Sequence, residues 1–353
     1  SEFLVRRARI CASGTIYKYY SFKVEPEFGM GGGALNDGYL NIKYIPEIQC
    51  KIGQFKVPFS VDELTSDNYI DFIERPLPAD NLVPSRDYGI MFHGDLASGI
   101  VHYGIGIFNG TRKNKGDCND EKDIAARLVL SPFQKCENLC LQGLHLGGAM
   151  TSGNEDMSIQ SDQDYWWSKG KFQTAGDTKF FEFDSAVSHR GRRNRYGAEL
   201  VWIRGPFSLK GEWMRIDLND LENGSQRGNF HIKGGYVSCS YFITGEQQPF
   251  TKGVYKGITP KHKLSPKEGN WGAIQLIARY EMLDLDNHFL TDGYANAAQY
   301  TDQVDGFTLG VNWWLNANVR VMVNYNHVDF DNYVAAAGGT SEDIGLFRFQ
   351  LIY

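Results

Sequence analysis

The sequence predicts an all-β protein, and more specifically a transmembrane antiparallel β-barrel. Apolar and polar residues alternate with period two over most of the chain, in segments of about 9–15 residues. Short turns alternate with long polar loops. No stretch approaches the roughly 18–20 consecutive apolar residues that a transmembrane helix needs. The strands of membrane barrels keep a low average hydropathy, so the mean hydropathy of −0.38 is compatible with this fold.

The clearest alternation lies near the end of the chain. In residues 346–353 one face carries Phe347, Phe349, Leu351 and Tyr353, and Arg348 and Gln350 share the other. The segments 307–314 and 319–326 repeat this pattern. The same alternation predicts earlier strands at residues 37–45, 48–56, 88–96, 100–108, 123–133, 141–150, 195–204, 207–217, 230–244 and 270–284. Each segment is long enough to cross a bilayer as a tilted strand.

The connections give the orientation of the strands. Residues 205–206 and 316–318 are short turns, whereas long polar loops are expected at 218–229, 285–304 and 331–344. Outer-membrane barrels have short periplasmic turns and long external loops. Counting strands from the short turns places further external loops at residues 26–36, 57–87, 109–122 and 151–192. It places the long connection 245–269 on the periplasmic side, as an exception to the rule.

This counting yields about fifteen crossings, beginning with a strand at residues 3–11 and a turn at 12–13. Closed bacterial barrels have an even number of strands, because an odd number leaves unpaired edges in the lipid. We therefore expect about 16 strands, the first of which precedes Ser1 and is missing from this chain. Residues 178–187 could form a further strand, but parity places them inside an external loop. The prediction is one barrel domain over residues 1–353.

Composition disfavours several other classes of protein. The net charge of −6 argues against nucleic-acid binding. His93, His102 and His145 lack partners at metal-ligand spacing, and neither a phosphate loop nor a Gly-x-Ser-x-Gly motif is present. We expect no catalytic step, no metal and no cofactor.

Six cysteines are unusual for an outer-membrane protein. Only Cys136 and Cys140 are close in sequence, and their spacing fits neither haem attachment nor a zinc site. The expected state is unpaired thiols, with a local disulfide as the alternative. The other four are Cys11, Cys50, Cys118 and Cys239.

Several stretches resemble the phosphate-selective porin O and P family. Residues 53–60, which read GQFKVPFS, are similar to the family's GQFK-x-PF signature, and the Arg-rich opening at 3–9 looks like its early strand. Further similar stretches follow in order at residues 63–66, 73–78, 84–89, 107–110, 125–128, 243–246 and 348–351. The resemblance implies a sixteen-stranded trimeric porin of the bacterial outer membrane. It also implies loops folded into the lumen and a long periplasmic turn that folds inward.

Lys and Arg on the polar faces of the strands predict selectivity for anions. A charge facing lipid at mid-bilayer would cost about 2–4 kcal/mol, so these side chains are expected to face the lumen. Arg6 is expected instead to extend toward the lipid headgroups. The predicted pore-lining and anion-binding residues are Arg7, Arg9, Lys43, Lys51, Lys56, Arg75, Arg86, Arg127, Lys210, Arg279, Arg320 and Arg348.

The loop 57–87 is the predicted constriction, since it carries Arg75 and Arg86 and is stiffened by proline. The alternative is that these two arginines only pin the loop through Glu74 and Asp87. The predicted function is passive diffusion of small inorganic or organic anions such as phosphate, by a homotrimer within the lipid bilayer. The alternative function is a barrel scaffold that sheathes or docks an additional protein partner, for example a redox protein.

Overall fold

The computed structural model describes residues 3–116, 120–137, 139–154, 157–158 and 171–352. Its wall is one sheet in which each long strand pairs antiparallel with the next along the chain. The wall strands are β1 (Ala12–Ile16), β2 (Tyr20–Glu27), β3 (Ala34–Ile45), β4 (Ile48–Lys56), β5 (Arg86–Leu96), β6 (Val101–Phe108), β7 (Asp123–Leu130), β8 (Leu144–Asn154), β13 (Arg192–Arg204), β14 (Phe207–Asn223), β15 (Gln226–Phe242), β18 (Ala273–Leu285), β19 (Gln303–Trp314), β20 (Val319–Val334) and β21 (Gly339–Leu351). The all-β prediction is confirmed.

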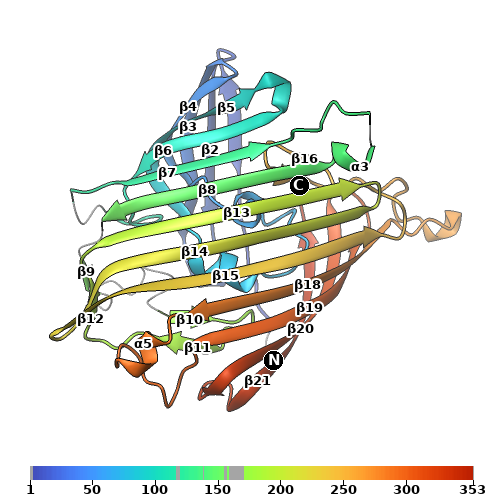
Figure 1. Cartoon of the computed structure of the whole chain (residues 1–353). Helices are drawn as coiled ribbons and strands as arrows, with labels where there is room; N and C mark the ends of the chain where they lie inside the picture. Colours follow the sequence, from blue (N-terminus) through green and yellow to red (C-terminus); the bar gives the residue numbers. More distant parts are fainter. Residues whose placement is uncertain (1–2, 117–119, 138, 155–156, 159–170, 353) are drawn as a thin grey trace.

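The strands curve around an interior, as Figure 1 shows. Among the described residues β1 and β21 are not paired with each other, so the sheet is not closed. The turns at 205–206 and 315–318 mark one end of the wall, which we name the short-turn end. The opposite end, where segments 57–85 and 286–302 emerge, is the long-loop end.

The wall carries apolar side chains on its outer face and charged side chains on its inner face, the reverse of a water-soluble protein. Outward positions carry large apolar side chains, such as Leu309, which is 51% exposed. Inward positions carry charged side chains that are buried, such as Lys210 at 2% and Arg320 at 1% exposed. Lipid around the wall would solvate the apolar face, and lumen partners satisfy the charged face.

Shorter elements lie in the connections between the wall strands. They are the helices α1 (Val61–Leu64), α2 (Leu77–Leu82), α3 (Leu139–Gln142) and α5 (His288–Thr291), and the short strands β9 (Met157–Ser158), β10 (Lys171–Gln173), β11 (Lys179–Glu182), β12 (Val187–His189), β16 (Phe250–Thr251) and β17 (Val254–Tyr255). Three-residue 3-10 turns occur at Gly29–Gly31, Ala97–Gly99 and Pro266–Glu268. No helix among the described residues is long and apolar enough to span a membrane.

The interior of the wall is occupied by segments of the chain itself. Segment 57–85, which we name the lumen loop, contains α1 and α2 and lies against inward side chains of β14 to β21. Segment 245–260, the short-turn insert, contains β16 and β17 and meets the lumen loop, where the Tyr255 backbone N–H donates to Thr65 Oγ1 (3.2 Å). The hairpin β10–β11 lies within the connection between β8 and β13 and pairs with itself. Parity had placed residues 178–187 in that connection.

Three sequence predictions of turns and loops are wrong. The first turn lies at 17–19 instead of 12–13, because Tyr17 and Lys18 both adopt positive φ although neither is the Gly or Asn that such a turn favours. Residues 218–229 continue β14 and β15, and a β-bulge between Leu218 and Leu221 interrupts their alternation. Residues 331–344 likewise continue β20 and β21 and leave only a turn at 335–338.

The cysteine predictions are resolved for most of these residues. Cys136 and Cys140 are not joined by a disulfide, which excludes the local bridge. Cys11, Cys50 and Cys239 also carry no disulfide. Cys118 lies outside the described residues.

Candidate functional site

Wall carboxylates and amides hold the lumen loop at its backbone N–H groups. Glu212 on β14 accepts hydrogen bonds from the backbone N–H groups of Val61 and Asp62, each at 3.0 Å, at the start of α1. Glu281 on β18 accepts from the N–H of Leu77 (2.8 Å) at the start of α2. These donors are unsatisfied within a helix, so wall acceptors fix both helix starts.

Wall donors hold the loop between the two helices at its carbonyl groups. The Arg320 guanidinium donates to the carbonyl oxygen of Ile70 (2.8 Å). Asn312 donates to the carbonyl of Asp71 (2.8 Å), and Gln350 donates to that of Asn68 (3.2 Å). The loop backbone is therefore bonded to β19, β20 and β21 as well as to β14 and β18.

Asp67 is the charged centre of the lumen loop. Its carboxylate accepts a hydrogen bond from Arg9 (2.5 Å) and forms ion pairs with Arg75 (2.7 Å) and Arg7 (3.5 Å). Burial opposes ionisation of Asp67, but the guanidiniums of Arg75 and Arg7 hold its pKa well below the ordinary value. Burial likewise lowers the pKa of Arg75, but the charges of Asp67 and Glu63 raise it overall. The group therefore forms a charged cluster.

Buried charged side chains connect the wall to the lumen loop and to the short-turn insert. Lys210 on β14 lies 2.8 Å from the carboxylate of Asp62 in the lumen loop. Arg127 on β7 makes two hydrogen bonds to Glu199 on β13 (2.8 and 2.7 Å) and one to the carbonyl of Gly253 in the short-turn insert (2.8 Å). Because each charge has a close partner, these pairs fix the geometry of the inserts.

Most of the predicted pore-lining residues meet the lumen loop or its acidic side chains. These are Arg7, Arg9, Lys56, Arg75, Lys210, Arg279, Arg320 and Arg348. Arg127 contacts the short-turn insert. Lys43 lies near the short-turn end, where it donates to Thr15 Oγ1 (3.3 Å), and Lys51 lies over the rings of Tyr39 and Phe55.

The partners of several arginines differ from those expected from sequence. Arg75 pairs with Glu63 and Asp67, and Glu74 is occupied by Arg6 (3.1 Å). The expectation that Arg6 extends toward the lipid headgroups is therefore wrong, because Arg6 pairs with a partly buried carboxylate of the lumen loop. Arg86 pairs with Asp37 (2.7 Å) and not with Asp87. Asp87 accepts instead from the backbone N–H groups of Tyr88 (2.8 Å) and Gly110 (2.6 Å).

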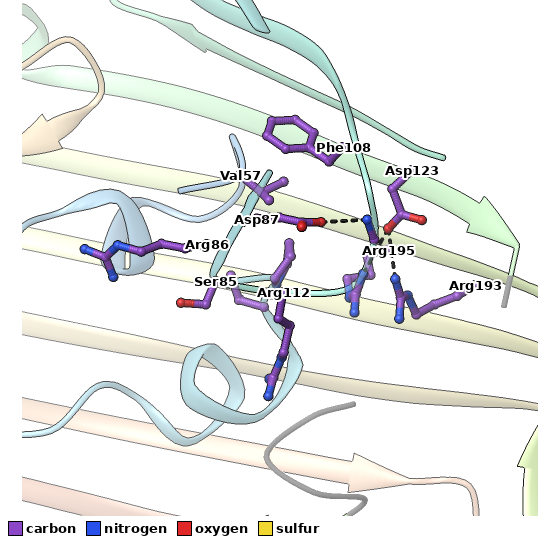
Figure 2. Close-up of a pocket in the computed structure, with 12 residues that line it drawn as sticks. Val57, Ser85, Arg86, Asp87, Phe108, Arg112, Asp123, Arg193 and Arg195 are labelled. Atoms are coloured by element: carbon purple, nitrogen blue, oxygen red, sulfur yellow. Dashed lines mark hydrogen bonds and ion pairs between the residues drawn. The ribbon is translucent and has the colours of Figure 1, made fainter. Parts of the chain in front are cut away.

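Four arginines line one pocket between the lumen loop and the wall. The pocket is lined by Arg86 at the start of β5, Arg112 in the loop between β6 and β7, and Arg193 and Arg195 on β13, together with Val57, Ser85, Asp87, Phe108 and Asp123. Arg193 lies 2.9 Å from Asp123, and Arg195 lies 4.0 Å from the same carboxylate. Figure 2 shows Asp87 and Asp123 beside Arg193 and Arg195, with Arg86 extending away from them. The pocket lining thus contains four arginines and two aspartates, and the guanidinium of Arg86 is paired with Asp37.

Sequence reasoning missed three of these four arginines. Arg193 and Arg195 share the inward face of β13, opposite Tyr196 and Leu200, so the period-two pattern contained the signal. The predicted strand began only at residue 195. Arg112 lies in a loop and adopts positive φ, so no periodicity marks it.

A second group of basic and imidazole side chains lies on the same wall nearer the short-turn end. Lys252, at the tip of the short-turn insert, lies 3.4 Å from Asp95 on β5. Asp95 also bonds His102 Nδ1 (2.8 Å), and His93 Nε2 bonds Asn41 (2.8 Å). In the described part of the chain, no group of three or more His, Cys, Asp and Glu side chains is placed to hold a metal ion.

The family description "Phosphate-selective porin O and P" matches residues 1–353. The chain belongs to this family. It is a porin of the bacterial outer membrane. The resemblance seen in the sequence is thereby confirmed.

Relatives and solved structures agree with this assignment. Porin O of Pseudomonas aeruginosa is 22% identical over 377 residues, which cover 99% of this chain and 81% of porin O. The outer membrane channel DcaP of Acinetobacter baumannii has a TM-score of 0.57 at 9% identity, covering 98% of this chain and 85% of DcaP. An anion-selective porin from Comamonas acidovorans has a TM-score of 0.52 at 11% identity, covering 97% and 89%. At such identities the structural likeness shows the fold alone.

Proposed function

We propose that this porin is a passive diffusion channel for small anions such as phosphate, without a catalytic step. Its constriction lies between the lumen loop and the wall formed by β5, β7 and β13. The whole chain acts as one barrel domain in this proposal. The names of the family and of the Comamonas acidovorans porin support the choice of anions.

The observation that carries the proposal is that Arg86, Arg112, Arg193 and Arg195 all line one pocket. Rings of basic side chains raise the local concentration of anions and lower the barrier to their entry. The carboxylate of Asp87 accepts hydrogen bonds from two backbone N–H groups, and these bonds reduce its repulsion of an anion. Asp123 holds Arg193 in place through their ion pair.

The other predicted residues have two roles in this proposal. Lys51, with Lys252, continues the basic wall toward the short-turn end. The arginines and lysines that contact the lumen loop contribute positive potential and set the width of the passage. Arg guanidinium groups suit phosphate and carboxylate because their planar forks give two parallel hydrogen bonds.

The barrel closes in this proposal with sixteen strands, the additional strand lying between the outer edges of β1 and β21. The absence of pairing between these two edges in the described residues supports the idea, since an open edge in lipid leaves backbone groups unsatisfied.

Three closed barrels form the functional assembly in this proposal. A trimer form of OmpT from Vibrio cholerae, with a TM-score of 0.53, has the same fold. Native mass spectrometry of the detergent-extracted protein tests the assembly.

The alternative of a sheath around a partner protein receives less support. The lumen loop and the short-turn insert occupy the interior, and both are bonded to the wall. A partner in the lumen would have to displace these segments.

Block of chloride current by phosphate tests the proposed site. In single-channel recordings, phosphate added to the wild type reduces the chloride conductance. Arg195→Gln raises the half-blocking phosphate concentration by about tenfold or more, since a charge-assisted hydrogen bond contributes about 1.5–3 kcal/mol. Arg215→Gln is the matched control, because Arg215 lies on β14 outside the pocket and pairs with Asp217. Phosphate block that is unchanged in Arg195→Gln contradicts the proposal.

A further inference from the structure

Five neighbouring wall strands change character along their inward faces. Near the short-turn end the inward residues are polar, as with Lys210 on β14, Gln275 on β18 and Arg320 on β20. At the long-loop end the inward residues of the same strands are large, apolar and at most 5% exposed. These are Leu218, Leu221, Phe230, Ile232, Leu283, Leu285, Val304, Val328 and Phe330. An inward apolar surface needs an apolar cover.

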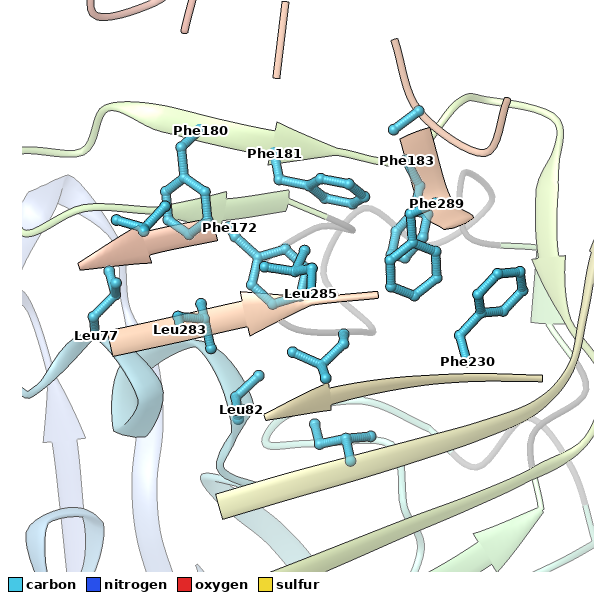
Figure 3. Close-up of a cluster of buried hydrophobic side chains, with 14 of the residues drawn as sticks. Leu77, Leu82, Phe172, Phe180, Phe181, Phe183, Phe230, Leu283, Leu285 and Phe289 are labelled. Atoms are coloured by element: carbon cyan, nitrogen blue, oxygen red, sulfur yellow. The ribbon is translucent and has the colours of Figure 1, made fainter. Parts of the chain in front are cut away.

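The cover is supplied by the hairpin β10–β11 and by α5. Phe172, Phe180 and Phe181 of the hairpin are all 0% exposed. The Phe181 ring lies 5.7 Å from that of Phe289 on α5, and Phe289 stacks on Phe230 of the wall at 4.6 Å. Figure 3 shows these rings together with Leu77 and Leu82 of α2. We name residues 171–183 and α5, with the wall residues they cover, the apolar plug.

Polar contacts fasten the plug on three sides. At the hairpin turn, Thr174 Oγ1 donates to Glu342 on β21 (2.8 Å). Beside the lumen loop, Asn81 and Gln173 exchange two hydrogen bonds, each of 3.1 Å. At its base, the backbone N–H of Asp184 donates to the carbonyl of Tyr294 (2.8 Å). The hairpin is thus fixed between β21, α2 and the loop that follows β18.

The opposite wall is charged at the same level. The long-loop ends of β3, β5, β7 and β13 carry the inward residues Asp37, Arg86, Asp123, Arg193 and Arg195, which are all buried. The pocket with four arginines lies against this wall. The lumen at the long-loop end therefore has one apolar, packed half and one charged half. A packed apolar region excludes water and ions.

We propose that the apolar plug closes the half of the lumen over β14, β15 and β18 to β20, and confines permeating anions to the passage along β3, β5, β7 and β13. This inference rests on the proposed function, because it assumes that anions cross the lumen. The plug thereby contributes to selectivity, because ions that follow this passage meet the arginine pocket.

Thiol accessibility tests the passage. In a variant without the native cysteines, one cysteine is placed in the arginine pocket (Ser85→Cys) and another beneath the plug (Val304→Cys). The probe is methanethiosulfonate ethylsulfonate, a small anionic thiol reagent. The pocket cysteine reacts at least a hundredfold faster than the covered one, and its reaction reduces the conductance. Comparable rates at both positions, or no reaction in the pocket, overturn the inference.

A second variant tests the plug itself. Phe181→Asp places a charge in the aromatic cluster and raises the reaction rate of the cysteine at position 304 by at least tenfold. An unchanged rate in a folded, conducting Phe181→Asp channel contradicts the role of the plug. A cationic thiol reagent of similar size separates the two proposals. If the cationic reagent modifies the pocket cysteine faster than the anionic one, the proposed anion preference is wrong. The difference in reaction rate between positions 85 and 304 still tests whether the plug confines the passage.

Discussion

Replacing Asp67 by Asn removes the charge at the centre of the lumen loop while preserving the size of the side chain. Asp67 is 3% exposed and lies within 3.5 Å of Arg7, Arg9 and Arg75. Removing one partner of a buried ion pair costs about 3–5 kcal/mol, because the remaining charge is left uncompensated. The barrel wall retains its own hydrogen bonds, so the substitution destabilises the attachment of the lumen loop to the wall and not the wall itself.

A cost of about 3 kcal/mol corresponds to a roughly hundredfold larger population of detached loop, at about 1.4 kcal/mol per factor of ten. Hydrogen–deuterium exchange of peptides covering residues 61–75, in detergent micelles, measures this population. We expect protection to fall about a hundredfold in Asp67→Asn and to stay unchanged in Asp292→Asn, since Asp292 is exposed and its side chain contacts the neighbouring His288 and Thr291. Protection within threefold of the wild type in Asp67→Asn would refute the reasoning.

The remaining predictions concern pH, the lipid-facing surface and the sheet. The pKa of Asp67 is lowered in the folded protein, so the ionised carboxylate stabilises the loop fully above the unfolded pKa of about 3.9. This stabilisation is lost only as pH falls through the lower pKa of the folded state. Hydrogen-exchange protection of the loop, corrected for the intrinsic exchange rate, should therefore be equal at pH 7 and pH 5. Loss of protection between pH 7 and pH 5 would contradict a lowered pKa of Asp67. Leu309→Arg at mid-strand should lower the unfolding free energy in lipid vesicles by about 2–4 kcal/mol, and Ile243→Arg near the short-turn end by about 0–1 kcal/mol. Equal costs would argue against a lipid-facing belt. Gly53→Ala should destabilise the protein more than Gly338→Ala. Both glycines have positive φ (+128° and +67°), but a Cβ at Gly53 would lie 2.2 Å from the carbonyl oxygen of Gly38, whereas a Cβ at Gly338 meets no atom within 4 Å. Thermal unfolding in detergent compares the two variants, and a smaller effect at Gly53 would count against the close approach of β3 and β4.

The wall could be predicted from sequence because its two faces meet different surroundings. Lipid favours apolar residues such as Leu309 and Phe347, and the lumen favours polar ones such as Arg320, so the sequence of each wall strand alternates with period two. The prediction failed where this contrast ends. At residues 218–229 the strands extend past the apolar belt and contain a bulge, so periodicity no longer marks them.

The arrangement inside the lumen could not be predicted in the same way. The pairing of Arg75 with Asp67, and of Arg6 with Glu74, depends on how the loop folds back on the wall, and sequence spacing does not encode such contacts. The apolar plug was missed for a related reason. Phe180 and Phe181 stand next to each other without alternation, because the hairpin is covered on both sides instead of lying between lipid and water.

The most direct test of the central claim is the reversal potential of the purified protein in a planar lipid bilayer with a tenfold gradient of potassium chloride. The account predicts a potential of the sign and size expected for preferential chloride permeation, and a shift toward zero when Arg193 and Arg195 are both replaced by Gln. A potential of the opposite sign, which indicates cation preference, or the absence of conductance would contradict it.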